Sequence, residues 1–234
     1  MALSATEPTG VKTPGHPRLL LFVRAPTPGR CKTRLSPPLS PLQGAALYRA
    51  FCVDVLTSAR ATGTEVHLAY APSNEQPNPT WLASDVPSFE QQGPTLGDRL
   101  IHAFETIFRD GPGPVAVIGT DAPTLSATQI LETFSALSHV DAVFIPAEDG
   151  GYCLAGLSQP QPSLFKNIPW STSEVMATTL RAAVGLRVQT FPPHYDVDTP
   201  QDLQRLSITL QSLPDTIAPK TRQCLKELTA GAPC

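Results

Sequence analysis

The sequence predicts an α/β fold in which a mostly parallel sheet is covered on both faces by helices. Apolar runs typical of buried strands alternate along the chain with segments of helical periodicity. Helices of about 10 to 15 residues between strands favour parallel pairing of those strands. The 234 residues can bury one sizeable core, and α/β folds of this length often form one domain. We therefore expect a single folded domain with frayed ends.

The expected elements follow from local patterns along the chain. Strands are expected where apolar runs occur, at residues 19–24, 65–71, 88–92, 115–119, 142–147, 152–157 and 186–191. Helices are expected where the apolar residues have helical spacing, at residues 41–61, 96–109, 127–138, 173–183, 199–213 and 221–230. Prolines, 26 in all, fall mostly between these segments and mark loops.

Several of the helices have recognisable start signals. Thr95 is expected to cap the helix at 96–109, with Asp98 in its first turn. The pair Ser171 and Glu174 has the spacing of a capping box and predicts the start of the helix at 173–183. Pro200 lies in the first turn of the helix at 199–213, as is common at helix starts.

The composition limits the function. A net charge of −3 and a pI near 5.9 argue against a nucleic-acid-binding protein. The apolar runs are far shorter than the roughly 20 residues of a membrane span, and the first 18 residues lack the apolar stretch of a secretory signal. Five cysteines without a C-x-x-C pair suggest neither a zinc site nor a complete disulfide framework. We expect a cytoplasmic protein.

Three parts are expected along the chain. Residues 1–17 contain Pro, Gly, Thr and Ser and are predicted to be a disordered leader, and residues 18–213 to be the folded domain. Residues 214–234 are predicted to be a helical extension that serves as a cap or as an interface, the latter allowing a homodimer.

A basic loop directly follows the first strand. It contains four cations within eleven residues, namely Arg24, Arg30, Lys32 and Arg34. Pro26, Pro28 and Gly29 shape its backbone. Because open α/β sheets bind ligands at the carboxyl ends of their strands, the loop is expected to bind an anion, most simply a di- or triphosphate.

Carboxylates follow the strand at 115–119 and recur near residue 196. Asp121 is placed to bind a divalent cation, which needs at least a second carboxylate or a phosphate. Asp196 and Asp198 are the candidates, since their spacing puts both on one side of an extended segment. The alternative is that Asp198 or Thr199 only caps the following helix.

Three further motifs have a structural and a functional interpretation. Asp149 and Gly150 form either a tight turn or a loop that approaches a ligand, with Asp149 available to bind a hydroxyl or act as a base. The segment 91–99 is either a capped helix entry or a contact to a ribose or base through Gln92, Gly97 or Asp98. Trp170 belongs either to the core or to the wall of a pocket. Hydrolase, zincin and P-loop motifs are absent from the sequence.

Taken in order, six motifs resemble one protein family. They are the basic Pro/Gly loop, Gln-Gly-x-x-Leu-Gly-Asp-Arg, Gly-Thr-Asp-Ala-Pro, Asp-Gly-Gly-Tyr, Pro-Trp-Ser-Thr and Asp-Val-Asp-Thr-Pro-x-Asp-Leu. The sequence from about residue 18 to 206 resembles the GT-A-fold proteins of the arsenosugar-biosynthesis-type glycosyltransferase family. This family belongs to the nucleotide-diphospho-sugar transferase superfamily, which also contains nucleotidyltransferases. The resemblance implies a Rossmann-like three-layer αβα sandwich that binds a nucleotide and Mg²⁺ or Mn²⁺.

The resemblance also assigns roles to residues. The loop implied to bind phosphates contains Arg24, Pro26, Gly29, Lys32, Thr33 and Arg34, with Lys32 also a catalytic candidate. Gln92, Gly97 and Asp98 would lie by the base and ribose, and Asp121 and Asp198 would share the metal. Asp149 would orient or deprotonate the acceptor in a pocket formed by Gly150, Gly151, Tyr152 and Trp170.

Three functions agree with this pattern. The first is glycosyl transfer from a nucleotide sugar to a small-molecule acceptor, which the family favours. The second is nucleotidyl transfer from a nucleoside triphosphate to a phosphorylated small molecule, which the cluster Lys32-Thr-Arg34 favours slightly. The single acid of Gly119-Thr-Asp121, where many glycosyltransferases have Asp-x-Asp, also resembles the nucleotidyltransferase arrangement. The third is a nucleotide-binding module without turnover.

Overall fold

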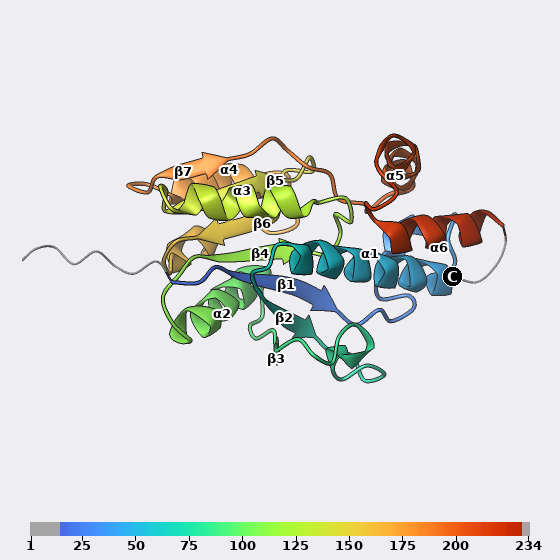
Figure 1. Cartoon of the computed structure of the whole chain (residues 1–234), viewed down its shortest axis with the longest axis horizontal. Helices are drawn as coiled ribbons and strands as arrows, with labels where there is room; N and C mark the ends of the chain where they lie inside the picture. The colour runs from blue at the N-terminus through green and yellow to red at the C-terminus, as the bar shows by residue number, and fades with distance from the viewer. Residues whose placement is uncertain (1–14, 231–234) are drawn as a thin grey trace, which may run out of the picture.

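A seven-stranded mixed sheet forms the centre of the molecule in the computed structural model, which describes residues 15–230 (Figure 1). The strand order is β3-β2-β1-β4-β6-β5-β7, and β6 is the antiparallel member, paired with β4 and β5. The other pairs, β1 with β2 and β4, β2 with β3 and β5 with β7, are parallel. The strands are β1 (Arg18–Arg24), β2 (Glu65–Ala71), β3 (Ser88–Glu90), β4 (Val115–Gly119), β5 (Ala142–Pro146), β6 (Tyr152–Leu157) and β7 (Val188–Thr190).

Helices cover both faces of this sheet. Alternation along β1 separates the two cores: Leu19 and Leu21 pack with α1 (Pro41–Ala61) and α3 (Ala127–Leu137), whereas Leu20 faces the opposite side. That opposite side is covered by α2 (Leu96–Arg109), α4 (Val175–Ala182) and the short helix η3 (Pro162–Phe165). The result is the three-layer αβα arrangement predicted from the sequence.

A third apolar cluster joins the two terminal helices to the rest of the domain. Helices α5 (Pro200–Ser212) and α6 (Pro219–Thr229) pack around α1 through Phe51, Leu206 and Leu210. Figure 1 shows α6 lying along α1. The predicted helical extension is therefore continuous with the packing of the domain.

All of the expected strands and helices are present, and several of them have shorter ends. The strand expected at 88–92 ends at Glu90, and the strand expected at 186–191 spans Val188–Thr190. The predicted capping box of Ser171 and Glu174 was wrong: α4 begins at Val175, and its N-cap residue Glu174 makes no side-chain cap. The residues of the predicted leader up to residue 14 lie outside the described part of the chain. Between residues 15 and 230, none of the helices has the length and apolar character of a membrane span.

Candidate active site

Two adjoining cavities lie where the parallel strands β1 and β4 end, at the edge where open α/β sheets bind ligands. The basic cavity has a volume of about 410 Å³ and is lined by three cations, Arg24, Lys32 and Arg99. The acidic cavity, of about 220 Å³, contains Asp149 and Asp196. The lining residues common to both cavities are Leu96, Gly119, Asp121 and Tyr152.

Side chains from several elements form the basic cavity. Arg24 is the last residue of β1, and Arg99 lies in the first turns of α2, where its Nε donates to the Gly93 carbonyl over 3.0 Å. The Nε2 of Gln91 donates to the carbonyls of Val23 (3.3 Å) and Ala69 (2.9 Å). The Nη1 of Arg24 donates to the Arg30 carbonyl over 3.4 Å, so Arg24 and Arg99 are both held at the rim of a cavity that suits an anion.

Lys32 forms the junction between the basic loop and the carboxylates. Its ammonium lies 2.5 Å from Oδ1 of Asp121 and 2.8 Å from Oδ1 of Asp198, and it donates to the Val197 carbonyl over 2.7 Å. Burial opposes the charge on Lys32, but attraction to the two carboxylates outweighs it and raises the pKa of the ammonium above its usual value. Lys32 is therefore a charged, almost fully buried side chain that bridges Asp121 and Asp198, the latter 166 positions further along the chain.

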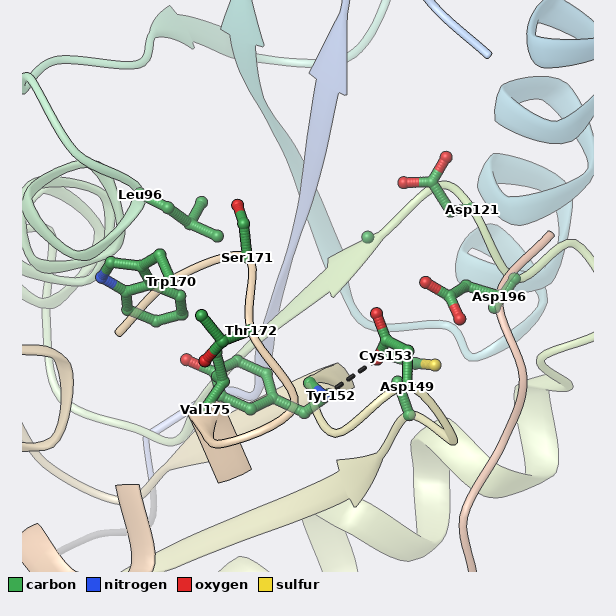
Figure 2. A pocket seen from close by; sticks show the side chains of 14 residues that line it. Leu96, Asp121, Asp149, Tyr152, Cys153, Trp170, Ser171, Thr172, Val175 and Asp196 are labelled. Carbon is green, nitrogen blue, oxygen red and sulfur yellow. Dashed lines mark hydrogen bonds between the residues drawn. The ribbon is translucent and has the colours of Figure 1, made fainter. Parts of the chain in front are cut away.

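The acidic cavity has carboxylates on one side and apolar walls on the other (Figure 2). The Oδ1 of Asp149 accepts a hydrogen bond from the Gly151 amide over 2.8 Å, which fixes its side chain. Burial, together with the charges of Asp149 and Asp198, raises the pKa of Asp196 to about 6. Figure 2 shows Asp149 and Asp196 close to each other, with Trp170 across the cavity. Carboxylates in this position can accept hydrogen bonds from hydroxyl groups.

The aromatic wall of the acidic cavity depends on a close contact. The rings of Tyr152 and Trp170 meet edge to face, with centroids 6.1 Å apart. A Cβ atom at Gly97 would lie 2.8 Å from Nε1 of Trp170 and 2.3 Å from the Phe165 carbonyl oxygen. Gly97 therefore lets the start of α2 approach the loop that holds Trp170.

The structure brings about half of the sequence-predicted site residues to the cavities. Those that line a cavity are Arg24, Lys32, Asp121, Asp149, Gly151, Tyr152, Trp170 and Asp198. Those that line neither are Pro26, Gly29, Thr33, Arg34, Gln92, Gly97, Asp98 and Gly150.

The residues outside the cavities have other positions. Pro26 is buried, whereas Gly29, Thr33 and Arg34 are exposed. Gln92 is exposed too, and the neighbouring Gln91 lines the basic cavity in its place.

Asp98 and Gly150 serve the backbone. The Oδ2 of Asp98 accepts hydrogen bonds from the amide and hydroxyl of Thr95, completing the cap of α2. Gly150 has a φ of 95°, and a Cβ atom there would lie 2.2 Å from the Ser173 carbonyl oxygen. The turn interpretation of residues 149–150 and the ligand-loop interpretation are compatible, since the turn is what directs Asp149 to the cavity.

Several residues that line the cavities were not predicted from the sequence, among them Arg99, Gln91 and Tyr48. Arg99 lies in the motif Gln-Gly-x-x-Leu-Gly-Asp-Arg, and a cation beside the predicted anion site was a usable signal. Gln91 was next to the residue that was selected. Tyr48 left no local signal: its hydroxyl meets Oγ1 of Thr120 at 2.9 Å and accepts from the amide of Arg24 at 3.1 Å, contacts that depend on tertiary packing.

The carboxylates of Asp121 and Asp198 offer oxygen ligands of the kind that divalent cations prefer. The side chains of Asp121 and Asp198 are 47% and 40% exposed, so both retain oxygen atoms that a ligand can reach. Mg²⁺ is commonly bound by one or two carboxylates with phosphate oxygens and water completing its shell. In the described part of the chain, no group of three or more His, Cys, Asp or Glu side chains is arranged to hold a metal ion. A metal bound by these two residues would therefore need further oxygen ligands, which phosphate and water can supply.

Comparison with solved structures agrees with this fold. A protein from Desulfovibrio desulfuricans G20 described as a "putative nucleotide-diphospho-sugar transferase" is 32% identical over 92% of this chain and 95% of that one, with a TM-score of 0.84. The fold is thus the α/β fold of nucleotide-diphospho-sugar transferases. The chain belongs to the family described as "Uncharacterized protein conserved in bacteria (DUF2064)", which matches residues 55–172.

More distant structures share the fold alone. A cytidylyltransferase from Leptospira borgpetersenii serovar Hardjo-bovis is 13% identical, with a TM-score of 0.55 and coverage of 92% of this chain and 95% of that one. The 4-diphosphocytidyl-2C-methyl-D-erythritol synthase of Anaerococcus prevotii DSM 20548 is 11% identical, with a TM-score of 0.51 and coverage of 82% and 98%. No curated protein is significantly similar to the sequence.

Proposed function

We propose that the protein is a nucleotide-dependent transferase that moves a glycosyl group from a nucleoside diphosphate sugar to a small-molecule acceptor. The observation that supports this most is the meeting of two cavities of opposite charge at Asp121. The basic cavity matches a diphosphate, and the acidic cavity with Trp170 matches an uncharged hydroxylated group. The similarity to the Desulfovibrio desulfuricans protein supports the same donor class.

The charge of the acidic cavity favours glycosyl over nucleotidyl transfer. Nucleotidyl transfer needs a second substrate that carries a phosphate. The described residues that line the acidic cavity include Asp121, Asp149 and Asp196 but neither Lys nor Arg. Since like charges repel, a phosphorylated co-substrate is disfavoured there. A neutral acceptor hydroxyl can instead donate hydrogen bonds to the carboxylates.

In this reaction the acceptor oxygen forms a bond to C1 of the sugar while the bond from C1 to the phosphate oxygen breaks. The electron pair of the broken bond leaves with the nucleoside diphosphate, whose added charge Arg24 and Arg99 stabilise. Asp149, held by the Gly151 amide, takes the proton of the acceptor hydroxyl. Asp196 shares the same cavity and orients the acceptor through a hydrogen bond.

Mg²⁺ or Mn²⁺, held by Asp121 and Asp198, would supply positive charge to the phosphate oxygens when bound. The two carboxylates fit this role because they are oxygen ligands and because their side chains are partly exposed to the basic cavity.

A ligand screen tests the proposal. Purified protein is heated with nucleotide sugars, nucleoside diphosphates and nucleoside triphosphates, each with and without Mn²⁺, because binding to the native state raises the melting temperature. The stabilising nucleotide sugar is then incubated with hydroxylated acceptors, and release of nucleoside diphosphate is measured. Release of pyrophosphate from a triphosphate and a sugar phosphate would instead establish nucleotidyl transfer. Binding without any turnover would indicate a non-catalytic nucleotide-binding module.

A variant pair assigns the base. Asp149→Asn is expected to lower turnover by about 10²-fold or more while nucleotide binding stays unchanged. The matched control is Glu132→Gln on the exposed surface of α3, which removes a carboxylate that lines neither cavity and should leave turnover unchanged. Full turnover by Asp149→Asn would exclude Asp149 as the base.

A further inference from the structure

The ammonium of Lys32 has no hydrogen-bond donor left for a phosphate in this structure. An ammonium has three N–H donors, and Lys32 has three acceptors in reach: Asp121, Asp198 and the Val197 carbonyl. Its side chain is only 3% exposed. A phosphate contact therefore requires Lys32 to leave at least one of these acceptors.

The same geometry bears on metal binding. Lys32 lies between the two carboxylates proposed to hold a divalent cation, so it already neutralises part of their charge. A metal ion bound to both carboxylates would face the ammonium at close range, and like charges at that distance repel strongly. Metal binding by Asp121 and Asp198 therefore displaces the ammonium.

The displaced ammonium has few favourable places to go. The adjoining space is the basic cavity, whose other cations are Arg24 and Arg99, and the ring of Phe51 lies 5.5 Å from Nζ on another side. Without an anion in the basic cavity, Lys32 would exchange two carboxylates for two like charges. A diphosphate in the basic cavity makes this position favourable for the ammonium, since its oxygens accept hydrogen bonds from Lys32 and also complete the coordination shell of the metal.

We infer that Lys32 is an exchangeable internal counterion of Asp121 and Asp198. These carboxylates bind a divalent cation well only when a nucleoside diphosphate group is bound too, because its oxygens then accept the hydrogen bonds of the displaced ammonium. The inference rests on the proposed nucleotide site. Because coupling between two ligands is reciprocal, the metal raises the affinity for the nucleotide by the same factor, expected to be about tenfold or more.

Mn²⁺ titration followed by electron paramagnetic resonance tests this, since it measures binding without turnover. Wild-type protein is titrated with Mn²⁺ alone and with Mn²⁺ in the presence of UDP, GDP, CDP or ADP, after subtraction of the Mn²⁺ that each nucleotide binds in solution. We expect weak binding of Mn²⁺ alone and an increase of about tenfold or more with the preferred nucleotide. Equal affinity with and without a nucleotide that binds the protein would overturn the exchange.

Variants distinguish a specific effect of the Lys32 ammonium on Mn²⁺ affinity from a general effect of net charge. Lys32→Met is expected to bind Mn²⁺ alone about tenfold or more tightly than wild type, and adding Asp121→Asn should abolish that gain. Lys32→Arg keeps the charge and should bind Mn²⁺ alone as weakly as wild type. Arg34→Met is the matched control, because it removes a cation of the same loop that is exposed and lines neither cavity. Its Mn²⁺ affinity should stay within about twofold of wild type, as Debye screening limits the reach of an exposed charge.

The outcomes distinguish the inference from the function it rests on. If Lys32→Met gains no Mn²⁺ affinity although it is folded, the ammonium is not the competing cation and the inference fails. If Arg34→Met gains as much as Lys32→Met, the effect is one of net charge, and the inference also fails. If Lys32→Met gains Mn²⁺ affinity but no nucleotide binds any variant, the counterion role of Lys32 holds and the proposed nucleotide site is wrong. If Lys32→Met does not fold, the wild-type titration with and without nucleotide decides the question.

Discussion

The guanidinium of Arg205 lies over the ring of Tyr195, with its central carbon 4.1 Å from the ring centroid. The same guanidinium donates to both carboxylate oxygens of Glu148, over 2.5 and 2.8 Å. Tyr195 precedes Asp196 and Glu148 precedes Asp149, so one side chain of α5 contacts both loops that supply carboxylates to the acidic cavity. The backbones of these loops are also paired, since the Glu148 amide donates to the His194 carbonyl over 3.1 Å.

Replacement of this arginine should loosen the two loops more than it destabilises the protein. Arg205→Met is expected to lower the free energy of unfolding by about 1 kcal/mol or less, because Arg205 and Glu148 are both about half exposed. Hydrogen exchange at the amides of Glu148 and His194 should accelerate about threefold to tenfold, since local opening then costs less. The control is Arg60→Met, which breaks the exposed pair with Asp85 and should leave exchange at these amides unchanged. Equal exchange rates in wild type and Arg205→Met would show that the backbone pairing alone holds the loops.

A methyl group at Gly97 should disturb the wall of the acidic cavity. A Cβ atom there would clash with the Phe165 carbonyl and with Trp170, so Gly97→Ala is expected to lower stability by about 1 to 3 kcal/mol. Urea denaturation measures the loss. Trp170 fluorescence, isolated by the background substitution Trp81→Phe, should shift as the ring moves.

The matched control for Gly97 is a helical glycine with space beside it. A Cβ atom at Gly44, inside α1, would lie 3.6 Å from its nearest neighbour, the Lys32 carbonyl oxygen, which is ordinary contact. Gly44→Ala should therefore leave stability unchanged or raise it by up to about 1 kcal/mol, because alanine favours helix more than glycine does. A Gly97→Ala variant as stable as Gly44→Ala would contradict the close contact at Trp170.

The elements that local chemistry determines could be predicted from the sequence. Thr95 caps α2 and Thr199 caps α5 through reciprocal bonds with Asp98 and Asp202, and each cap needs residues only three positions apart. Ser171 has the same apparent signal with Glu174, but its φ of 64° places it in a turn before the helix. The sequence-based prediction failed there because tertiary contacts of the loop outweighed a local pattern.

The site was harder to predict because its contacts join distant parts of the chain. The residue types at Lys32, Asp121 and Asp198 indicated phosphate and metal chemistry, but their arrangement around one ammonium depends on packing between β4 and the segment before α5. A shift of one position likewise decides which glutamine reaches the cavity. The Gln91 amide still pairs with the Tyr70 carbonyl over 2.9 Å, just beyond the end of β3, and Gln92 follows in solvent.

An ion pair at the edge of the sheet should make stability depend on pH. The hydrogen bonds from Arg187 to Asp141, from its side chain and from its amide over 2.8 Å, hold the pKa of Asp141 below its usual value. Since the folded-state pKa is lowered, the pair stabilises the protein above the unfolded pKa, and this stabilisation is lost as pH falls through the folded pKa. Asp141→Asn should therefore cost about 0.5 to 1 kcal/mol at pH 7 and nothing once Asp141 is protonated in acid. Denaturation midpoints of both proteins across this pH range measure the effect, and a constant difference would contradict it.

Asp54 links the terminal helix to the body of the protein. It is 2% exposed in α1, and its two oxygens accept from the amides of Lys220 (3.0 Å) and Thr221 (2.7 Å). These amides lie in the first turn of α6, where unpaired N–H groups occur, and the helix has no side-chain cap of its own because Ala218 is its N-cap residue. Asp54 therefore caps α6 from another helix.

Removal of this cap should release α6 from α1. Asp54→Ala leaves two N–H groups without an acceptor and is expected to lower stability by about 1 to 3 kcal/mol, with faster proteolysis within α6. Asp54→Asn retains one acceptor oxygen and should lie between the alanine variant and wild type. The control is Asp215→Ala, which removes a fully exposed carboxylate close to the start of α6 and should change stability by less than about 0.5 kcal/mol. If Asp54→Ala and Asp215→Ala had the same small effect, α6 would be held by its apolar contacts with Phe51 and its neighbours rather than by the cap.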